Sequence, residues 1–201
     1  MNVTLLSIQA VGIGGDRWPA AEMFCKTISD SRWESFFRLI FNDKKVIELG
    51  AGTGLVAIIV EKLFSPKSVI VTDLDSHLPL IKDNLRLNST KYCETMPLDW
   101  TRTDYMGSND VILVLECVYN EDLYLPLIHT LDRICLENSI IFLGLTRLFA
   151  KQKFFALLTE SGFKYTMIPE RSLPEQYADE FSDRDVGLFV VTRHICTKLH
   201  S

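Results

Sequence analysis

The sequence predicts an α/β protein built on a mostly parallel sheet with helices on both faces. Short apolar runs rich in β-branched residues alternate with segments of helical spacing, a pattern typical of parallel strands joined by crossover helices. One strand runs into a glycine-rich loop, Gly50-Ala51-Gly52-Thr53-Gly54, which opens a helix. The last two β-rich runs flank a charged stretch, which indicates an antiparallel hairpin at a sheet edge.

The boundaries of the elements follow from the apolar periodicity. We expect strands over Lys45–Leu49, Ser68–Thr72, Asp110–Leu115 and Ser139–Leu145, and a further strand region just before Leu98. Helices are expected over Leu55–Phe64, Leu78–Asn88, Leu123–Cys135 and Phe149–Ser161, the last ended by Gly162. The hairpin is expected to pair Phe163–Ile168 with Gly187–Arg193 across Pro169–Asp185. Pro19 suits the first turn of another helix, within an N-terminal helical segment over residues 1–42.

Size and composition narrow the class of protein. A chain of 201 residues is long enough for one domain with a continuous core, so we expect a single domain over residues 1–201. We also expect the protein to be a monomer. The net charge of -5 argues against general binding to nucleic-acid phosphates. No apolar run has membrane-spanning length. The five cysteines lack paired spacing, so neither a disulfide framework nor a zinc site is indicated, and we expect a cytoplasmic or nuclear location.

The glycine loop favours a nucleoside-containing cofactor with a cationic end. Glycines at positions 50, 52 and 54 leave backbone N–H groups and open space at the carboxyl edge of the sheet. A dinucleotide-binding loop would carry a glycine at the sixth position, where this chain has Leu55. Glu48 places a carboxylate beside the loop, which would repel a pyrophosphate and attract a positive charge. A ligand-free turn between strand and helix is the alternative.

Polar and aromatic residues after the next strands suit the rest of such a cofactor. Asp73 ends the second strand about 20 residues beyond the loop, where an acid accepts hydrogen bonds from ribose hydroxyls. Asp75 competes for that role, and Asp73 could instead cap a helix. Asp99 and Trp100 together could supply a polar edge and an apolar face for an adenine.

Four matches, two of which combine a pair of segments, carry a resemblance to a known family. They are Trp18-Pro19-Ala20-Ala21; Val46-Ile47-Glu48-Leu49-Gly50-Ala51-Gly52-Thr53-Gly54; Val71-Thr72-Asp73-Leu74 with Leu85-Arg86-Leu87-Asn88; and Glu116-Cys117-Val118-Tyr119 with the leucine-rich segment from Leu125 to Leu131. The chain resembles the seven-β-strand, non-SET protein-lysine methyltransferases, also called methyltransferase family sixteen. The resemblance implies a Rossmann-like class I methyltransferase fold with a seven-stranded sheet. It also implies S-adenosyl-L-methionine as cofactor and S-adenosyl-L-homocysteine as product.

The resemblance also implies which residues line the cofactor: Trp18, Glu48, Gly50, Ala51, Gly52, Asp73, Trp100 and Leu115. Two positions depart from the family pattern. Relatives usually carry a small residue where this chain has Leu115, and more often Asp than Glu at the position of Glu116. The contact of Leu115 and the geometry at Glu116 are therefore the points at which this chain differs from its relatives.

Glu116 and Tyr119 are the candidate catalytic residues. Methyl transfer from a sulfonium to an amine needs a neutral nitrogen aimed at the methyl group, whereas a free lysine has a pKa of about 10.4. Glu116 could accept the N–H bonds of the amine, and Tyr119 could wall its channel with a ring face or hydroxyl. Whether Glu116 acts as a base or only positions the amine stays open. A strand-end carboxylate paired with a basic residue, and a packed aromatic, are the structural alternatives.

Other functions compatible with this pattern are methylation of a protein histidine, a nucleic acid or a small molecule, or a catalytically silent binding module of the same fold. The Pro-Pro-aromatic motif expected of nucleic-acid and glutamine methyltransferases is absent after the predicted strand Asp110–Leu115. The resemblance implies instead a protein substrate with an exposed lysine, such as a chaperone, an AAA ATPase or a translation factor. No metal site, membrane partner or nucleic-acid partner is expected.

Overall fold

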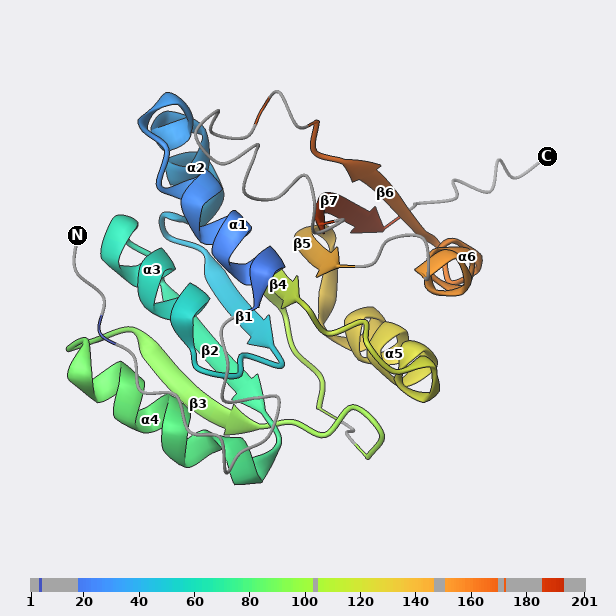
Figure 1. Ribbon diagram of the computed structural model, residues 1–201, viewed down its shortest axis with the longest axis horizontal. Coiled ribbons are helices and arrows are strands. Elements are labelled where there is room, and N and C mark those ends of the chain that lie inside the picture. The colour runs from blue at the N-terminus through green and yellow to red at the C-terminus, as the bar shows by residue number, and fades with distance from the viewer. Residues whose placement is uncertain are drawn as a thin grey trace.

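Seven strands form one mixed sheet at the centre of the protein (Figure 1). The computed structural model describes residue 4 and residues 18–102, 105–146, 151–169, 172 and 186–193. The strands are β1 (Lys45–Leu49), β2 (Ser68–Asp73), β3 (Cys93–Pro97), β4 (Asn109–Leu115), β5 (Cys135–Thr146), β6 (Phe163–Met167) and β7 (Val186–Arg193). Their order across the sheet is β3-β2-β1-β4-β5-β7-β6.

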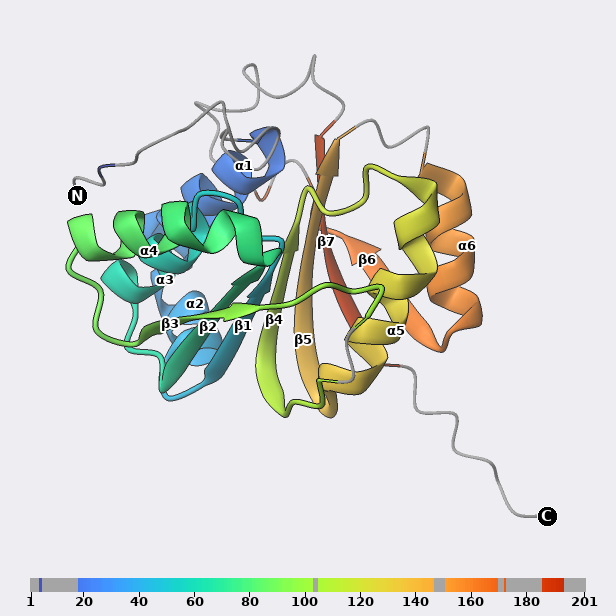
Figure 2. The ribbon, with the colours of Figure 1, turned by 90° about the horizontal axis from the view of Figure 1, so that it is seen from below.

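The helices lie between the strands along the chain. They are α1 (Pro19–Ile28), α2 (Glu34–Phe41), α3 (Leu55–Leu63), α4 (Leu78–Leu87), α5 (Tyr124–Ile134) and α6 (Gln152–Glu160), with short 3-10 turns η2 (Ser31–Trp33), η3 (Asp75–His77) and η4 (Glu121–Leu123). In Figure 2, α1 to α4 lie on one side of the sheet, and α5 and α6 lie on the other. The prediction of an α/β fold with helices on both faces is therefore confirmed.

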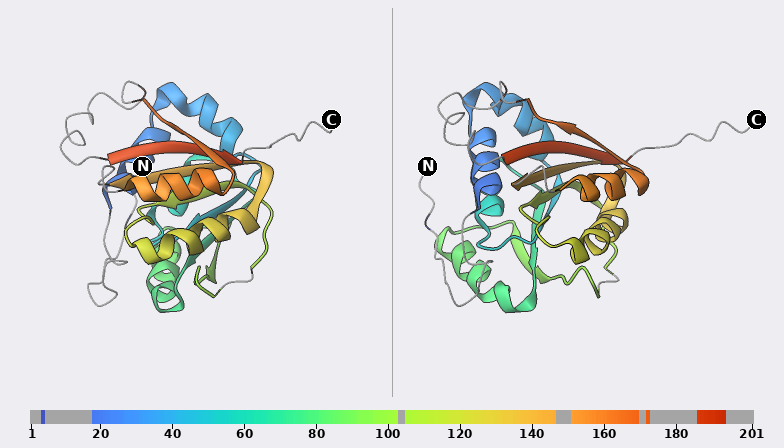
Figure 3. Two further views of the ribbon diagram at one scale, coloured as in Figure 1. Left: turned by 90° about the vertical axis from the view of Figure 1, so that its right-hand side faces the viewer. Right: turned by 45° about the vertical axis from the view of Figure 1, so that its right-hand side comes forward.

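The pairing of the strands is parallel except at the C-terminal end. The pairs β3-β2, β2-β1, β1-β4 and β4-β5 are parallel, whereas β7 runs antiparallel to both β5 and β6. Figure 3 shows β6 and β7 together at the end of the sheet that is remote from β3. The expected hairpin is thus present, and β7 inserts between β5 and β6. Most of Pro169–Asp185, which joins these strands, lies outside the described residues.

The largest difference from the expected boundaries concerns the start of β5. The apolar pattern predicts a strand from Ser139, but β5 begins at Cys135, directly after α5. Cys135 pairs with Asn109, and regular pairing resumes only where Ile140 faces Val111. The intervening residues bulge out, with positions 136–138 exposed and Ser139 buried, so they lack the apolar alternation from which a strand is predicted. Similarly, α6 begins at Gln152 rather than at position 149, and residues 147–150 lie outside the described part.

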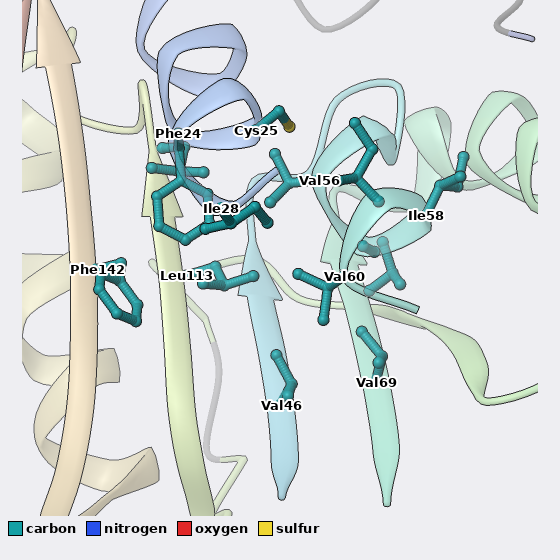
Figure 4. Packing of buried hydrophobic residues seen from close by; sticks show 14 of the residues in the cluster. Phe24, Cys25, Ile28, Val46, Val56, Ile58, Val60, Val69, Leu113 and Phe142 are labelled. Carbon is teal, nitrogen blue, oxygen red and sulfur yellow. The ribbon is translucent and has the colours of Figure 1, made fainter. Parts of the chain in front are cut away.

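Two apolar layers, one on each face, stabilise the sheet. On one face, side chains of α1 to α4 pack on alternate residues of the strands, including Val46, Val69 and Leu113. Figure 4 shows Phe24 and Ile28 of α1 facing this layer, with side chains of α3 beside them. The opposite face buries the other alternate residues under α5 and α6. Because both faces are covered, the central strands read as continuous apolar runs in the sequence.

Phe142 of β5 lies at the centre of an aromatic cluster on the first face. Its ring centroid is 5.1 Å from that of Phe24, 6.2 Å from that of Phe37 and 6.1 Å from that of Phe41. All four side chains are almost completely buried. These contacts attach α1 and α2 to the sheet and therefore fix where α1 begins.

Phe142→Ala should destabilise the protein by about 3–5 kcal/mol, because it removes a buried ring and leaves a cavity between α1, α2 and the sheet. Urea unfolding followed by circular dichroism measures the change. Leu39→Ala is the matched control, since Leu39 of α2 is 78% exposed and its truncation should change the free energy of unfolding by less than about 0.5 kcal/mol. Equal effects of the two substitutions would contradict the proposed role of the cluster.

Candidate active site

A cavity of about 610 Å³ opens at the carboxyl ends of β1, β2 and β4. This volume is in the range of about 300–1,000 Å³ that is usual for small-ligand sites. The parallel register aligns these strand ends, with Glu48 of β1 opposite Val71 of β2 and Leu113 of β4. All the predicted site residues line the cavity: Trp18, Glu48, Gly50, Ala51, Gly52, Asp73, Trp100, Leu115, Glu116 and Tyr119. The structure thus brings them together, and their individual roles stay predictions.

The glycine loop has a shape that side chains would prevent. Gly50 and Gly52 adopt φ angles of 59° and 58°, in the left-handed region that favours glycine. A Cβ atom on Gly50 would lie 2.9 Å from Cys117 Sγ and 3.3 Å from Trp100 Cζ2. The Ala51 backbone N–H donates to Thr72 O at 2.9 Å, which attaches the loop to the end of β2. The loop therefore passes close over a floor made by Cys117 and Trp100.

The Asp73 carboxylate accepts hydrogen bonds from the loop and from its own neighbourhood. Its Oδ2 accepts from Gly52 N at 2.8 Å, while Oδ1 accepts from Leu74 N at 2.7 Å and lies 2.7 Å from His77 Nδ1. Asp73 is 8% exposed and faces the cavity. Asp75, its competitor for the ribose role, is exposed in η3 and does not line the cavity. The geometry therefore favours Asp73.

Glu48 is a buried acid at the loop. Its side chain accepts a hydrogen bond from Ala57 N, in the first turn of α3, at 3.0 Å. Burial, together with the nearby charge of Asp73, raises the pKa of Glu48 from 4.5 to about 8, while the bond from Ala57 opposes this rise. A cationic ligand would favour the ionised form of this carboxyl group.

Trp100 and Asp99 line the cavity beyond β3. Trp100 Nε1 is buried and has no hydrogen-bond partner among the described residues, so this donor is left for a bound polar group. Asp99 Oδ1 accepts from both the backbone N–H and the hydroxyl of Thr101, and these bonds lower the pKa of Asp99. The donor of Trp100 and the acid of Asp99 fit the polar edge of a purine.

Glu116 connects three parts of the site. Its Oε1 accepts from Ala20 N in the first turn of α1 at 3.0 Å, and Oε2 accepts from Thr146 N at 3.2 Å and Thr146 Oγ1 at 3.1 Å. Its backbone has a φ of 62°, which is rare for a residue with a side chain. No basic residue contacts this carboxylate in the part of the chain described. The expected strand-end acid is therefore held by N–H and O–H donors at the cavity wall.

Tyr119 and Cys117 follow Glu116 and differ in their accessibility. Tyr119 is 57% exposed at the cavity wall, and partial burial, together with the nearby acidic groups of Cys117 and Asp73, raises the pKa of its hydroxyl. Tyr119 therefore stays a hydrogen-bond donor at neutral pH. Cys117 is buried and donates to Leu49 O at 3.0 Å, and burial raises the pKa of its thiol well above the ordinary value. Cys117 is thus a packing residue rather than a nucleophile.

Several cavity residues were not predicted from the sequence. His77 contacts Asp73, Thr146 contacts Glu116, and Lys151 lies 9% exposed at the start of α6. His77 follows Asp73 by four residues, but Asp73 ends β2 and His77 ends η3, so no helical spacing indicates this contact. The other two depend on how β5 and α6 meet the end of β4, for which the sequence carries no local signal.

In the described ranges no cluster of His, Cys, Asp and Glu could hold a metal ion, and no helix is long and apolar enough to span a bilayer.

Comparison with known proteins identifies the family. Residues 3–161 match the family model described as lysine methyltransferase, which is most of the chain. The chain belongs to the lysine methyltransferase family. Protein-lysine N-methyltransferase EFM6 from Saccharomyces cerevisiae is 30% identical over 192 residues, covering 84% of this chain and 78% of that protein. EEF1A lysine methyltransferase 3 from Xenopus tropicalis is also 30% identical over 192 residues, covering 92% and 77%.

Solved structures confirm the class I methyltransferase fold. The ribosomal protein L11 methylase from Lactobacillus delbrueckii subsp. bulgaricus superposes with a TM-score of 0.64 and 19% sequence identity, over 88% of this chain and 81% of that one. The predicted lysine methyltransferase family and its enzymatic activity, the transfer of methyl groups to protein lysine, are thus shown. A narrower resemblance of the motifs, to the valosin-containing-protein lysine methyltransferase, stays a prediction.

Gly50→Ala should abolish binding of S-adenosylhomocysteine and destabilise the protein by more than about 2 kcal/mol, because strain in the left-handed region adds to the clash with Cys117. Gly162→Ala is the matched control, since Gly162 has a φ of 84° and open space around its Cβ position. It should cost about 1–2 kcal/mol and leave binding unchanged. Isothermal titration and urea unfolding measure both effects. Normal binding of S-adenosylhomocysteine by Gly50→Ala would contradict the close approach of Gly50 to Cys117.

The free energy of unfolding of Glu48→Gln should exceed that of the parent protein by an amount that grows as the pH rises. In the folded state the Glu48 carboxyl has a pKa of about 8, so between about pH 4.5 and 8 it is ionised when unfolded and protonated when folded. The parent therefore loses stability across this window, and the variant does not. We expect the difference to grow by about 1–4 kcal/mol between pH 5 and 8.5, measured by urea unfolding. Parallel pH profiles would show that Glu48 titrates normally.

Proposed function

We propose that the cavity binds S-adenosylmethionine and that the side-chain amine of a protein lysine enters beside Glu116 and Tyr119. The observation that carries this proposal is the convergence of Glu48, Asp73 and Glu116 on one cavity that also contains the glycine loop. Three carboxyl groups around a space of this size suit two cationic groups, a sulfonium cofactor and a lysine.

The residues of the cavity match the parts of this cofactor. The open backbone at Gly50 and Gly52 would hold its amino-acid end beside Glu48, and Asp73 would accept from the ribose. Trp100, with its unpartnered indole N–H, and Asp99 would hold the adenine. Trp18, Ala51 and Leu115 would line the remaining walls. When bound, S-adenosylmethionine supplies a methyl group activated by the positive charge of its sulfur.

The acceptor side must orient an amine and favour its neutral form. Glu116 would accept one N–H bond of the lysine through the lone pair of Oε1 that Ala20 leaves free, because Thr146 N and Oγ1 occupy both sites of Oε2. Because these donors fix the carboxylate, it serves better to position the amine than to carry its proton away. Tyr119 would form the outer wall and exclude water, with its hydroxyl protonated. The incoming ammonium therefore loses its proton to solvent before the amine passes this wall and water is excluded.

The relatives support a proposal for the class of protein substrate. One of them is named for EEF1A, so a translation factor is the first candidate, with chaperones and AAA ATPases as the other classes that the family resemblance implies. We propose that the protein acts as a monomer in the cytoplasm, and also in the nucleus. The acidic cavity supports a lysine acceptor over a nucleic acid, whose phosphates it would repel.

Incubation of the protein with methyl-labelled cofactor and a cell extract tests the proposed function. We expect label in a protein band and mass spectrometry to locate it on a lysine. Label on histidine or nucleic acid would contradict the lysine assignment. Binding of S-adenosylhomocysteine without transfer to any acceptor would indicate a silent binding module.

Glu116→Gln should leave the dissociation constant of S-adenosylhomocysteine within about twofold and lower kcat/KM about ten- to a hundredfold, the worth of a charge-assisted hydrogen bond to the amine. The substitution keeps the volume and an oxygen acceptor for Ala20 N. Glu121→Gln is the control, since Glu121 is exposed and pairs with Lys153 outside the cavity. A methylation assay on the identified substrate measures both variants. Unchanged kcat/KM in Glu116→Gln would remove its charge from the mechanism.

A further inference from the structure

The Asp73 carboxylate has too few free lone pairs to bind a ribose alone. A carboxylate offers about four acceptor sites, two on each oxygen. Leu74 N and His77 Nδ1 occupy those of Oδ1, and Gly52 N occupies one of those of Oδ2. A single site therefore remains, whereas a ribose brings two vicinal hydroxyl groups as donors.

His77 lies where a second acceptor is needed. It ends η3, directly before α4, and its side chain is 17% exposed beside Asp73. Both residues line the cavity. The 2.7 Å contact places His77 Nδ1 against the carboxylate, and so the ring orientation is fixed by a charged partner. In the described part of the chain no hydrogen bond engages His77 Nε2.

The tautomer of the ring follows from this contact. Because Asp73 Oδ1 can only accept, a neutral His77 carries its proton on Nδ1 and presents a lone pair on Nε2. We propose that His77 and Asp73 form a joint ribose site, in which the last free lone pair of Asp73 accepts one hydroxyl and His77 Nε2 accepts the other. This inference rests on the proposed cofactor cavity and adds to it a residue that the sequence motifs do not include.

Two substitutions separate a direct contact from mere positioning of Asp73. His77→Asn retains an amide N–H near the place of Nδ1, so it can still donate to Asp73, but it has no counterpart of Nε2. His77→Phe keeps the ring and loses both nitrogens. His129→Asn is the matched control, because His129 lies exposed on α5 and away from the cavity. Thermal melting verifies that each variant is folded.

The experiment measures how much each ribose hydroxyl contributes to ligand binding, and it does not measure activity. Titration at pH 8 gives dissociation constants for 5′-methylthioadenosine and for its 2′-deoxy and 3′-deoxy forms. The parent protein and His129→Asn should bind each deoxy form about tenfold or more weakly, since each lacks one hydrogen bond to an acid or imidazole acceptor. In His77→Asn and His77→Phe, we expect one of the two deoxy forms to bind within about twofold of 5′-methylthioadenosine, because the acceptor of that hydroxyl is gone.

Other results would overturn the inference. Discrimination retained in His77→Asn but lost in His77→Phe would show that His77 only positions Asp73. Discrimination retained in both variants would show that Asp73 or another group accepts both hydroxyls. Failure of the parent protein to bind 5′-methylthioadenosine or S-adenosylhomocysteine at all would instead overturn the proposed cofactor cavity, and this inference with it.

Discussion

The parallel pairing of β1 with β2 and β4 is the constraint on which the site depends. It aligns Glu48 with Val71 and Leu113, so the chain leaves all three strands at the same edge of the sheet. Glu48, Asp73 and Glu116 therefore converge although up to 68 residues separate them in the chain. The apolar layers on both faces fix this register, because a shift by one residue would turn every buried side chain to the opposite face.

Backbone N–H groups make it possible to bury three acids at this edge. Glu48 accepts from Ala57 N at the start of α3, Asp73 from Gly52 N in the loop, and Glu116 from Ala20 N at the start of α1. The first N–H groups of a helix lack partners within the helix and carry partial positive charge, so they suit a carboxylate. Hydrogen bonds of this kind favour the ionised form of a carboxyl group, although at Glu48 burial outweighs the bond from Ala57 and the pKa stays raised until a cationic ligand favours ionisation.

The elements of the fold were predictable because they depend on local patterns. The strands Lys45–Leu49 and Ser68–Thr72 agree with β1 and β2 to within one residue, since buried parallel strands are continuous apolar runs. The start of β5 was placed four residues late because its bulge exposes the intervening side chains. Gly162, with a φ of 84°, follows α6 as its position in the pattern indicates.

The residues that line the site could be predicted from the sequence, whereas the contacts between them could not. Motif positions at strand ends placed Glu48, Asp73 and Glu116 at the cavity, because topology alone carries them there. No sequence pattern indicates that Gly50 would clash with Cys117, or that Glu116 accepts from Ala20, 96 residues away. Such contacts arise from packing between elements, which the order of residues along one strand does not encode.

The link between Glu116 and α1 has a consequence for how the acceptor side forms. Glu116 takes a left-handed conformation, with a φ of 62°, that costs about 1–3 kcal/mol in a residue with a side chain. The bonds from Ala20 and Thr146 offset this cost, and they exist only when α1 and the end of β5 are packed in place. Phe24 and Phe142 bring these two elements together within the same apolar layer. The geometry of the acceptor carboxylate is thus set by the core beneath it, through the position of a helix that precedes the first strand.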